Sequence, residues 1–309
     1  MFLLGVLLST ACWSPAQEGL QFRGPANDNR PAAALRVKVN EVDLSFLASG
    51  RHHHWITDLS ANELRLKDNG KPPESIRFFQ SRTGLPLRVG LLLDTSDSVA
   101  QQFAFEKAAA ASFISQIIDP ARDLAFVMGF SNTVTVARDF TSDKQALASA
   151  FSQLRLKGTT AIYDAVDFAC EKLLQHAEHG LSRRVLVVLT DGQDNSSRIT
   201  PDQLIKSVAR CNATVIVLHT DHDPDSSSPE YRVLKKLTSE TGGELVRADS
   251  RKHLTRGFAL LRDELRSYYL LAYQPAEFIE DGSFRKIELK TTRHGAHIIC
   301  RRGYYAVRK

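Results

Sequence analysis

Three oxygen-bearing residues alternate in one short segment, directly after an apolar run. Asp94, Ser96 and Ser98 stand at positions i, i+2 and i+4, so their side chains project toward one point where a strand gives way to its loop. A carboxylate with two hydroxyls is an all-oxygen ligand set, which suits a hard cation and does not suit zinc or copper. Ser and Asp are also common helix N-caps, so this segment alone is a weak signal.

Two further segments offer oxygen ligands at corresponding places. Thr160 lies just before a predicted helix, and Asp191 follows the apolar run Val185 to Leu189 within Thr-Asp-Gly. The carboxyl ends of parallel strands meet at one edge of a sheet, where ligands sit in open α/β folds. All three segments are therefore expected at the same edge.

The order of these motifs resembles the von Willebrand factor type A fold and its metal-ion-dependent adhesion site. The resemblance implies that Ser96 and Ser98 are direct ligands of the ion and that Thr160 is a further ligand, direct or through water. It implies that Asp94 and Asp191 hold the ion directly or through bridging waters. The implied ion is Mg²⁺, or Mn²⁺ in its place, with one coordination position left for an acidic residue of a protein partner.

The flanking segments extend the resemblance to about residues 35 to 306. Asp68 to Lys71, Leu270 to Tyr273 and Arg301 to Tyr305 are similar to the exported bacterial "VWFA-related" family, known mainly from Acidobacteria.

Two positions depart from the usual motif, which commonly has Gly where Asp97 and Thr159 stand. Asp97 is predicted to cap the helix that starts near Val99. If Asp97 instead leaned toward the ion, the added negative charge would weaken capture of an acidic partner.

The elements that position these residues alternate between apolar, strand-length runs and amphipathic, helix-length segments. This alternation is typical of a doubly wound, mostly parallel α/β sheet covered on both faces. The predicted strands are Leu87–Leu93, Leu124–Phe130, Val185–Leu189 and Thr214–His219, with a short edge strand at Val134–Ala137. The predicted helices are Gln102–Ile118, Lys144–Leu154, Ile162–His176, Pro201–Arg210, Glu230–Thr241 and Lys252–Ser267.

Alternating hydrophobicity returns on both sides of the α/β domain, which we place at residues 84–267. Residues 35–83 are expected to contain strands near 35–39 and 42–46 and a hairpin of 63–67 with 75–80. Residues 268–309 are expected to contain strands at 268–274, 285–292 and 297–302. Because two or three strands alone are marginally stable, we predict that both ends pair into one small antiparallel β subdomain.

The amino terminus has the pattern of an export signal. Residues 1–16 contain an apolar run followed by small residues, Cys12 offers a lipid-attachment alternative, and residues 17–34 are expected to be a flexible linker. Elsewhere no apolar stretch reaches the length of a membrane span. We therefore predict an exported protein that is periplasmic, secreted or envelope-associated, with membrane attachment only through Cys12.

The remaining cysteines, histidines and clustered acidic residues do not predict a second metal site. Cys170, Cys211 and Cys300 lack zinc spacing and are expected to be buried, with one disulfide left open. Three adjacent histidines at 52–54 do not converge on one ion, and the acidic residues at 221–225 lack the glycine and glutamate of a calcium loop.

Composition and motifs limit the classes of function that we predict for this chain. The chain has 309 residues and a net charge of +5, with its basic residues scattered, which favours a protein partner over nucleic acid. No nucleophile elbow or phosphate loop occurs, and position 96 is Ser where aspartate-nucleophile phosphatases have Asp. We predict that the chain is not an enzyme but a cation-dependent adhesion module. The alternative is a structural or assembly component of the cell envelope whose metal site is incidental.

Overall fold

A six-stranded sheet forms the centre of the α/β domain. The computed structural model describes residues 41–50, 54–81, 84–175, 182–222 and 225–306. The strands are β4 (Leu87–Asp94), β5 (Leu124–Phe130), β6 (Val134–Thr141), β7 (Arg183–Thr190), β8 (Ala213–His219) and β9 (Leu245–Arg247). Their order is β6-β5-β4-β7-β8-β9, and only β6 runs antiparallel to its neighbour. The predicted fold class, a doubly wound and mostly parallel sheet, is confirmed.

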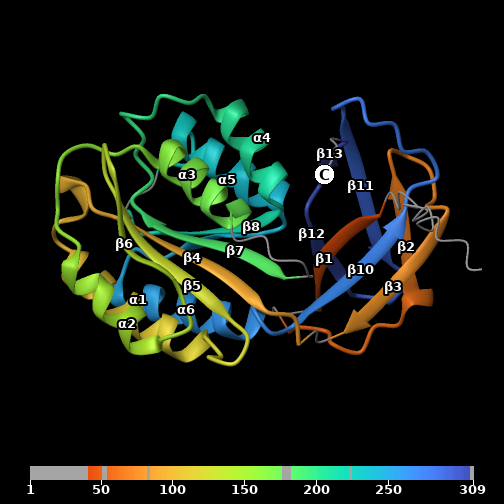
Figure 1. Ribbon diagram of the computed structural model, residues 1–309, viewed down its shortest axis with the longest axis horizontal. Coiled ribbons are helices and arrows are strands. Elements are labelled where there is room, and N and C mark those ends of the chain that lie inside the picture. Colours follow the sequence, from red (N-terminus) through yellow and green to blue (C-terminus); the bar gives the residue numbers. More distant parts are fainter. Residues whose placement is uncertain (1–40, 51–53, 82–83, 176–181, 223–224, 307–309) are drawn as a thin grey trace, which may run out of the picture. The chain divides into compact units, whose positions relative to one another are not determined.

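Helices cover both faces of this sheet (Figure 1). One face packs against α1 (Phe103–Ile117), α2 (Lys144–Ala150) and α6 (Arg251–Glu264). The other face packs against α3 (Ile162–Gln175), α4 (Pro201–Cys211) and α5 (Pro229–Thr241). Every residue of β4 is buried as a result, which explains why its sequence is almost continuously apolar.

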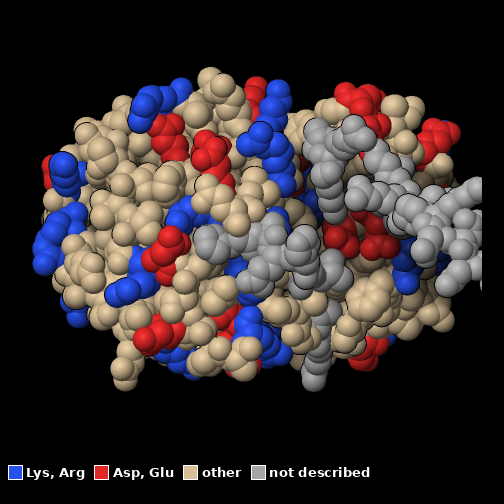
Figure 2. Space-filling view, in the orientation of Figure 1, with Lys and Arg blue, Asp and Glu red and all other residues tan. Residues whose placement is uncertain are grey.

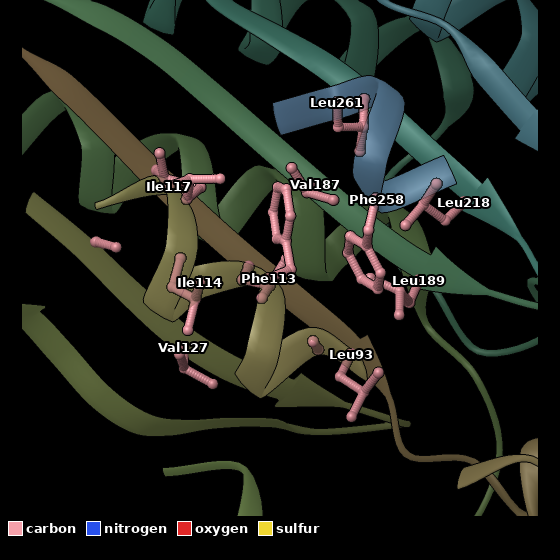
Figure 3. Close-up of a cluster of buried hydrophobic side chains, with 14 of the residues drawn as sticks. Leu93, Phe113, Ile114, Ile117, Val127, Val187, Leu189, Leu218, Phe258 and Leu261 are labelled. Carbon is pink, nitrogen blue, oxygen red and sulfur yellow. The ribbon is translucent and has the colours of Figure 1, made fainter. Parts of the chain in front are cut away.

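The core between the sheet and the first helix layer is closely packed (Figure 3). The rings of Phe113 on α1 and Phe258 on α6 stack with centroids 4.5 Å apart. Leu93 and Leu189, near the ends of neighbouring strands, are fully buried in the same cluster. This packing holds the carboxyl ends of β4 and β7 in fixed positions, as a preorganised binding site requires.

The strands outside this domain form a β subdomain of two antiparallel sheets. The strands of the first are β1 (Val42–Ser49), β3 (Ser75–Ser81), β10 (Tyr268–Gln274) and β12 (His297–Cys300), in the order β12-β1-β10-β3. The strands of the second are β2 (Leu64–Asp68), β11 (Phe284–Thr291) and β13 (Gly303–Tyr305), in the order β13-β11-β2. Segments from both ends of the chain thus pair, as expected for the fold class, while the proposed domain boundaries stay predictions.

The predicted hairpin of residues 63–67 with 75–80 is wrong. A tight turn does form, because the backbone groups of Asp68 and Lys71 exchange hydrogen bonds of 2.8 and 3.0 Å. The strand before the turn pairs with β11, however, and the strand after it pairs with β10. Pro72 and Pro73 follow the turn directly, and residues without an N–H cannot continue a ladder.

Several predictions fall on residues that the structure does not describe. The signal, the linker and Cys12 fall within residues 1–40, and two of the three adjacent histidines fall within 51–53. Within the described ranges, Cys170, Cys211 and Cys300 are free thiols, so the disulfide left open does not form there. No helix in those ranges is long and apolar enough to cross a membrane. Figure 2 shows acidic and basic side chains interspersed on the face drawn, consistent with the scattered charge of the sequence.

A buried ion pair joins the end of α6 to the start of β7. Arg183 and Glu264 are each about 4% exposed, with Nη2 and Oε1 3.7 Å apart. Arg183 also donates to the carbonyl oxygens of Glu264 and Leu265, and its guanidinium lies 4.5 Å from the ring centre of Tyr268. Burial raises the pKa of Glu264 to about 7 despite the nearby guanidinium, so the ionised form is disfavoured in the folded protein.

Glu264 should therefore make folding stability depend on pH. Between about pH 4.5 and 7 the folded state holds a proton on Glu264 that the unfolded chain has released, so stability falls as pH rises through this window. The slope from this group is at most about 1.4 kcal/mol per pH unit. Urea unfolding of Glu264→Gln at pH 5 and pH 8 should show less loss of stability than the wild type. Equal losses in the two proteins would contradict this assignment.

Candidate metal centre

The candidate site lies at the point where the strand order reverses. The strand β5, which follows β4 in the chain, lies on one side of β4, and β7 lies on its other side. The order of strands in the sheet therefore changes direction at β4. Ligands of open α/β sheets bind outside the carboxyl ends of the strands at such a point. Asp94 ends β4 and Thr190 ends β7, its parallel neighbour.

Asp94 is the centre of the hydrogen-bond arrangement. It is 0% exposed, and one carboxylate oxygen accepts from the Ser96 hydroxyl at 2.6 Å and the Ser96 N–H at 2.9 Å. The other oxygen accepts from the Thr190 hydroxyl at 2.7 Å. Burial raises the pKa of Asp94 to about 6 although these hydrogen bonds lower it, and the charge of Asp191 adds to the rise. A neighbouring cation would stabilise such a carboxylate in its ionised form.

The two serines follow Asp94 as expected, with hydroxyl oxygens 3.0 Å apart. Ser96 is buried and Ser98 is exposed, so the pair leads from the buried carboxylate to the surface. The prediction that Asp97 caps the following helix is wrong, because Ser96 occupies the N-cap position and Asp97 begins the short 3₁₀ turn Asp97–Val99. The side chain of Asp97 is exposed.

The Thr160 segment packs beside the Asp94 loop. The N–H of Asp97 donates to the carbonyl of Gly158 at 3.0 Å, and the N–H of Lys157 donates to the carbonyl of Thr95 at 2.7 Å. Thr160 is 2% exposed, and its hydroxyl makes no hydrogen bond to any residue that the structure describes. Its oxygen is therefore available to a ligand.

The Asp191 loop completes the same edge of the sheet. Asp191 directly follows Thr190, whose hydroxyl donates to Asp94 at 2.7 Å, and Asp191 is itself half-buried. Gly192 follows with φ of +90°, and a Cβ there would lie 2.5 Å from Nε2 of His219. Glycine is thus required for the chain to turn away from the site.

Sequence reasoning missed Thr190, although it stands directly before Asp191. It also missed Asn195, whose side-chain oxygen accepts from the N–H of Thr160 at 3.0 Å. The N–H groups of Asn195 and Ser196 both donate to the carbonyl of Thr160 at 3.0 Å. Asn195 therefore ties the Thr160 segment to the loop that carries Asp191.

A third missed residue is Glu106 on α1. It is 1% exposed, and neither of its oxygens has a hydrogen-bond partner within the described residues. Burial raises the pKa of Glu106 to about 7, opposed by the neighbouring Thr220, while Asp94 and Asp191 add to the rise by repulsion. A helix-periodicity signal existed, because Glu106 shares the buried face of α1 with Phe103 and Ala110.

The donor set suits the ion that the motif implies. Carboxylates and hydroxyls are the ligands preferred by Mg²⁺ and Mn²⁺, and no thiol or imidazole is among the five candidates. Among the described residues no three His, Cys, Asp or Glu side chains are grouped as metal ligands, and three of the five candidates here are instead serine or threonine hydroxyls. The residues that would hold the ion are Asp94, Ser96, Ser98, Thr160 and Asp191.

Fold and site together define a class: a doubly wound α/β domain with a carboxylate and hydroxyl cluster at its topological switch point. The chain belongs to the von Willebrand factor type A domain family, whose model matches residues 89–256, more than half of the 309 residues. Domains of this family generally mediate protein–protein interaction or adhesion, often with the help of a metal ion. No curated protein matches the chain.

The chain is similar to several solved structures at low sequence identity. A von Willebrand factor type A protein from Catenulispora acidiphila is 14% identical, with a TM-score of 0.51 over 81% of this chain and 75% of that one. BatB, a conserved hypothetical protein from Bacteroides thetaiotaomicron, is 17% identical, with a TM-score of 0.48 over 59% of this chain and 100% of its own. The PilB minor pilin from Streptococcus sanguinis is 13% identical, with a TM-score of 0.47 over 64% of this chain and 63% of that one.

Asn195 should affect cation binding by positioning Thr160. Asn195→Ala removes the acceptor for the Thr160 N–H, and loss of such a supporting residue typically costs about 10-fold to 100-fold in metal affinity. Asn195→Asp keeps an acceptor oxygen and should lose less. Isothermal titration with Mg²⁺ measures both, and an unchanged affinity in the alanine variant would show that Thr160 needs no such support.

Proposed function

We propose that this chain is a divalent-cation-dependent protein-binding domain of an exported bacterial protein. Its cation, Mg²⁺ or Mn²⁺, would be held by Asp94, Ser96, Ser98, Thr160 and Asp191. When bound, the ion supplies an open coordination position that accepts a carboxylate from an acidic side chain of a protein partner. The proposed role is binding and includes no catalytic step.

The observation that carries this proposal is the environment of Asp94. Asp94 is fully buried at the sheet edge, its pKa is raised by that burial, and the half-buried carboxylate of Asp191 follows Thr190, which bonds to Asp94. Such a concentration of negative charge is costly unless a cation compensates it. The path from Asp94 through the Ser96 and Ser98 hydroxyls to the exposed surface gives a partner access to that cation.

Asp94 and Asp97 are expected to have different roles in recognition. Asp94 is fixed from both sides by Ser96 and Thr190, so it is preorganised before any ligand arrives. Asp97, exposed beside the site, adds negative charge where an acidic partner would approach. Asp97→Ala should therefore leave cation binding intact and strengthen partner capture modestly.

Envelope localisation is part of the proposal and rests on the amino-terminal pattern of residues 1–16. Adhesion at the cell surface or capture of an envelope protein would suit a chain exported in this way.

Capture from envelope extracts tests the function. Immobilised chain is incubated with extract in Mg²⁺, in EDTA, and in EDTA followed by excess Mg²⁺. Proteins retained only when the cation is present support the proposal, and the acidic residue responsible is then identified by substitution in the captured protein. Association that resists EDTA would favour the alternative, a structural envelope component in which the cation is incidental.

A further inference from the structure

A second recognition feature lies next to the candidate metal centre. A hollow of about 370 Å³ opens between the loops that follow β7 and β8 and the first turn of α5. This volume falls within the range of ligand-binding pockets. Because β7 lies between β4 and β8, the hollow adjoins the Asp94 edge of the sheet, and Asp191 belongs to both. We call it the β7–β8 hollow.

The lining of the β7–β8 hollow is strongly acidic. No Lys or Arg is among the described residues that line it. Asp194 and Asp225 accept hydrogen bonds from the nearby serines Ser197 and Ser227. The acidic side chains that line it are Asp191, Asp194, Asp221, Asp225 and Glu230.

A buried imidazole provides the second, independent observation. His219 at the end of β8 lines the hollow, is only 5% exposed, and makes no side-chain hydrogen bond to any described residue. Burial lowers the pKa of His219, so the ring is neutral at pH 7 and offers one nitrogen as an acceptor. The ring of Tyr231 stands edge-on to it, with centroids 5.5 Å apart. An imidazole that is held by burial, makes no side-chain hydrogen bond to a described residue and lines a hollow can bond to a ligand there.

The chemistry of the occupant follows from this lining. An anion would be repelled by the carboxylates, and an apolar group would leave the imidazole unsatisfied. A guanidinium or ammonium group carries donors for both carboxylates and imidazole, and it packs favourably against a tyrosine ring.

We propose that the β7–β8 hollow binds an arginine or lysine side chain of the protein partner. The inference rests on the proposed function for the identity of the ligand, because it assigns the second group that the same partner presents. An acidic side chain at the cation and a basic side chain in the hollow would fix the partner's orientation as well as its affinity. The chain would then select partners whose surfaces carry the two charges side by side.

The test uses a probe that does not need the metal centre. The full chain, labelled with ¹⁵N, is titrated in EDTA with N-acetyl-arginine amide, N-acetyl-lysine amide and the uncharged N-acetyl-citrulline amide. We expect the charged probes to shift the amide signals of Gly192 and Tyr231, and citrulline to bind at least 10-fold more weakly. Citrulline binding as tight as arginine, or no shifts at these amides, would overturn the proposal.

Variants locate the site. The double substitution Glu230→Gln and Asp225→Asn should lower the affinity for the arginine probe at least 3-fold. Neither residue is a candidate ligand of the cation. Glu171→Gln makes the same kind of charge change on the exposed surface of α3 and serves as the matched control. Equal weakening by the control would overturn the assignment. Because EDTA is present throughout, failure here leaves cation-dependent capture standing, and failure of that capture leaves the arginine titration measurable.

Discussion

Mg²⁺ and Mn²⁺ binding should be lost when Asp94 is replaced by alanine. Asp94 is the buried carboxylate that Ser96 and Thr190 orient, so its removal deletes a ligand and releases two hydroxyls. Loss of a residue that only supports a ligand typically lowers metal affinity by about 10-fold to 100-fold. Because Asp94 is a candidate ligand itself, we expect the affinity for the cation to fall at least about 100-fold. Isothermal titration measures the loss, and capture of the partner in Mg²⁺ should fall to the level seen in EDTA.

Asp97→Ala is the matched control for this variant. It removes a carboxylate three positions away on the same loop, but an exposed one. Heats of cation binding should be nearly unchanged in Asp97→Ala and absent in Asp94→Ala. Equal heats in Asp94→Ala and the wild type would remove the proposed centre.

Thermal unfolding separates loss of the site from loss of the fold. A ligand at 100 times its dissociation constant stabilises the folded state by about 2.7 kcal/mol. The wild type should therefore melt at a higher temperature in Mg²⁺, whereas Asp94→Ala should not respond. Asp94→Asn keeps the shape of the side chain and one acceptor oxygen, for either the Ser96 or the Thr190 hydroxyl, so it should fold and still bind the cation poorly.

The fold was largely predictable from the sequence because its determinants are local or periodic. Strands such as β4 are apolar along almost their whole length. A continuous apolar run of this length is the pattern expected of a strand that is buried on both faces of a sheet. The failed hairpin shows the limit of this reasoning. The turn at Asp68 and Lys71 formed as its local chemistry predicts, but the partner of each strand was set by residues at least 188 positions away.

The candidate site was partly predictable for a related reason. Asp94 ends β4, Ser96 stands two positions later and Asp191 directly follows β7, so their positions at the sheet edge follow from the order of elements alone. Asn195 acts through a tertiary contact with Thr160, and nothing adjacent to it in the sequence indicates which loop it meets.

Asp68 carries the largest expected effect on stability. It ends β2, is 5% exposed, and one of its oxygens accepts from the hydroxyls of Tyr273 at 2.6 Å and Tyr304 at 2.9 Å. These tyrosines lie on β10 and β13, so one carboxylate joins strands of both sheets of the β subdomain. Burial and the Asp68 charge both raise the pKa of Tyr273 and Tyr304, which keeps each hydroxyl protonated as a donor.

Asp68→Ala should lower the free energy of unfolding by about 3 to 5 kcal/mol, because hydrogen bonds to a charged group contribute about 1.5 to 3 kcal/mol each and two buried hydroxyls lose their acceptor. Urea unfolding measures the change. Glu277→Ala removes an exposed carboxylate from an ion pair with Lys71 in the same subdomain, and such a surface pair contributes at most about 1 kcal/mol.

A double-mutant cycle shows whether the loss comes from the tyrosines. In Tyr273→Phe the donor is gone, so the further substitution Asp68→Ala should cost less than it does in the wild type. If the two losses simply add, Asp68 stabilises the subdomain through something other than the Tyr273 hydroxyl. Asp68→Asn retains an acceptor without the charge and should fall between the wild type and Asp68→Ala. That order would show that the charge strengthens a link between the two sheets that an uncharged acceptor also makes.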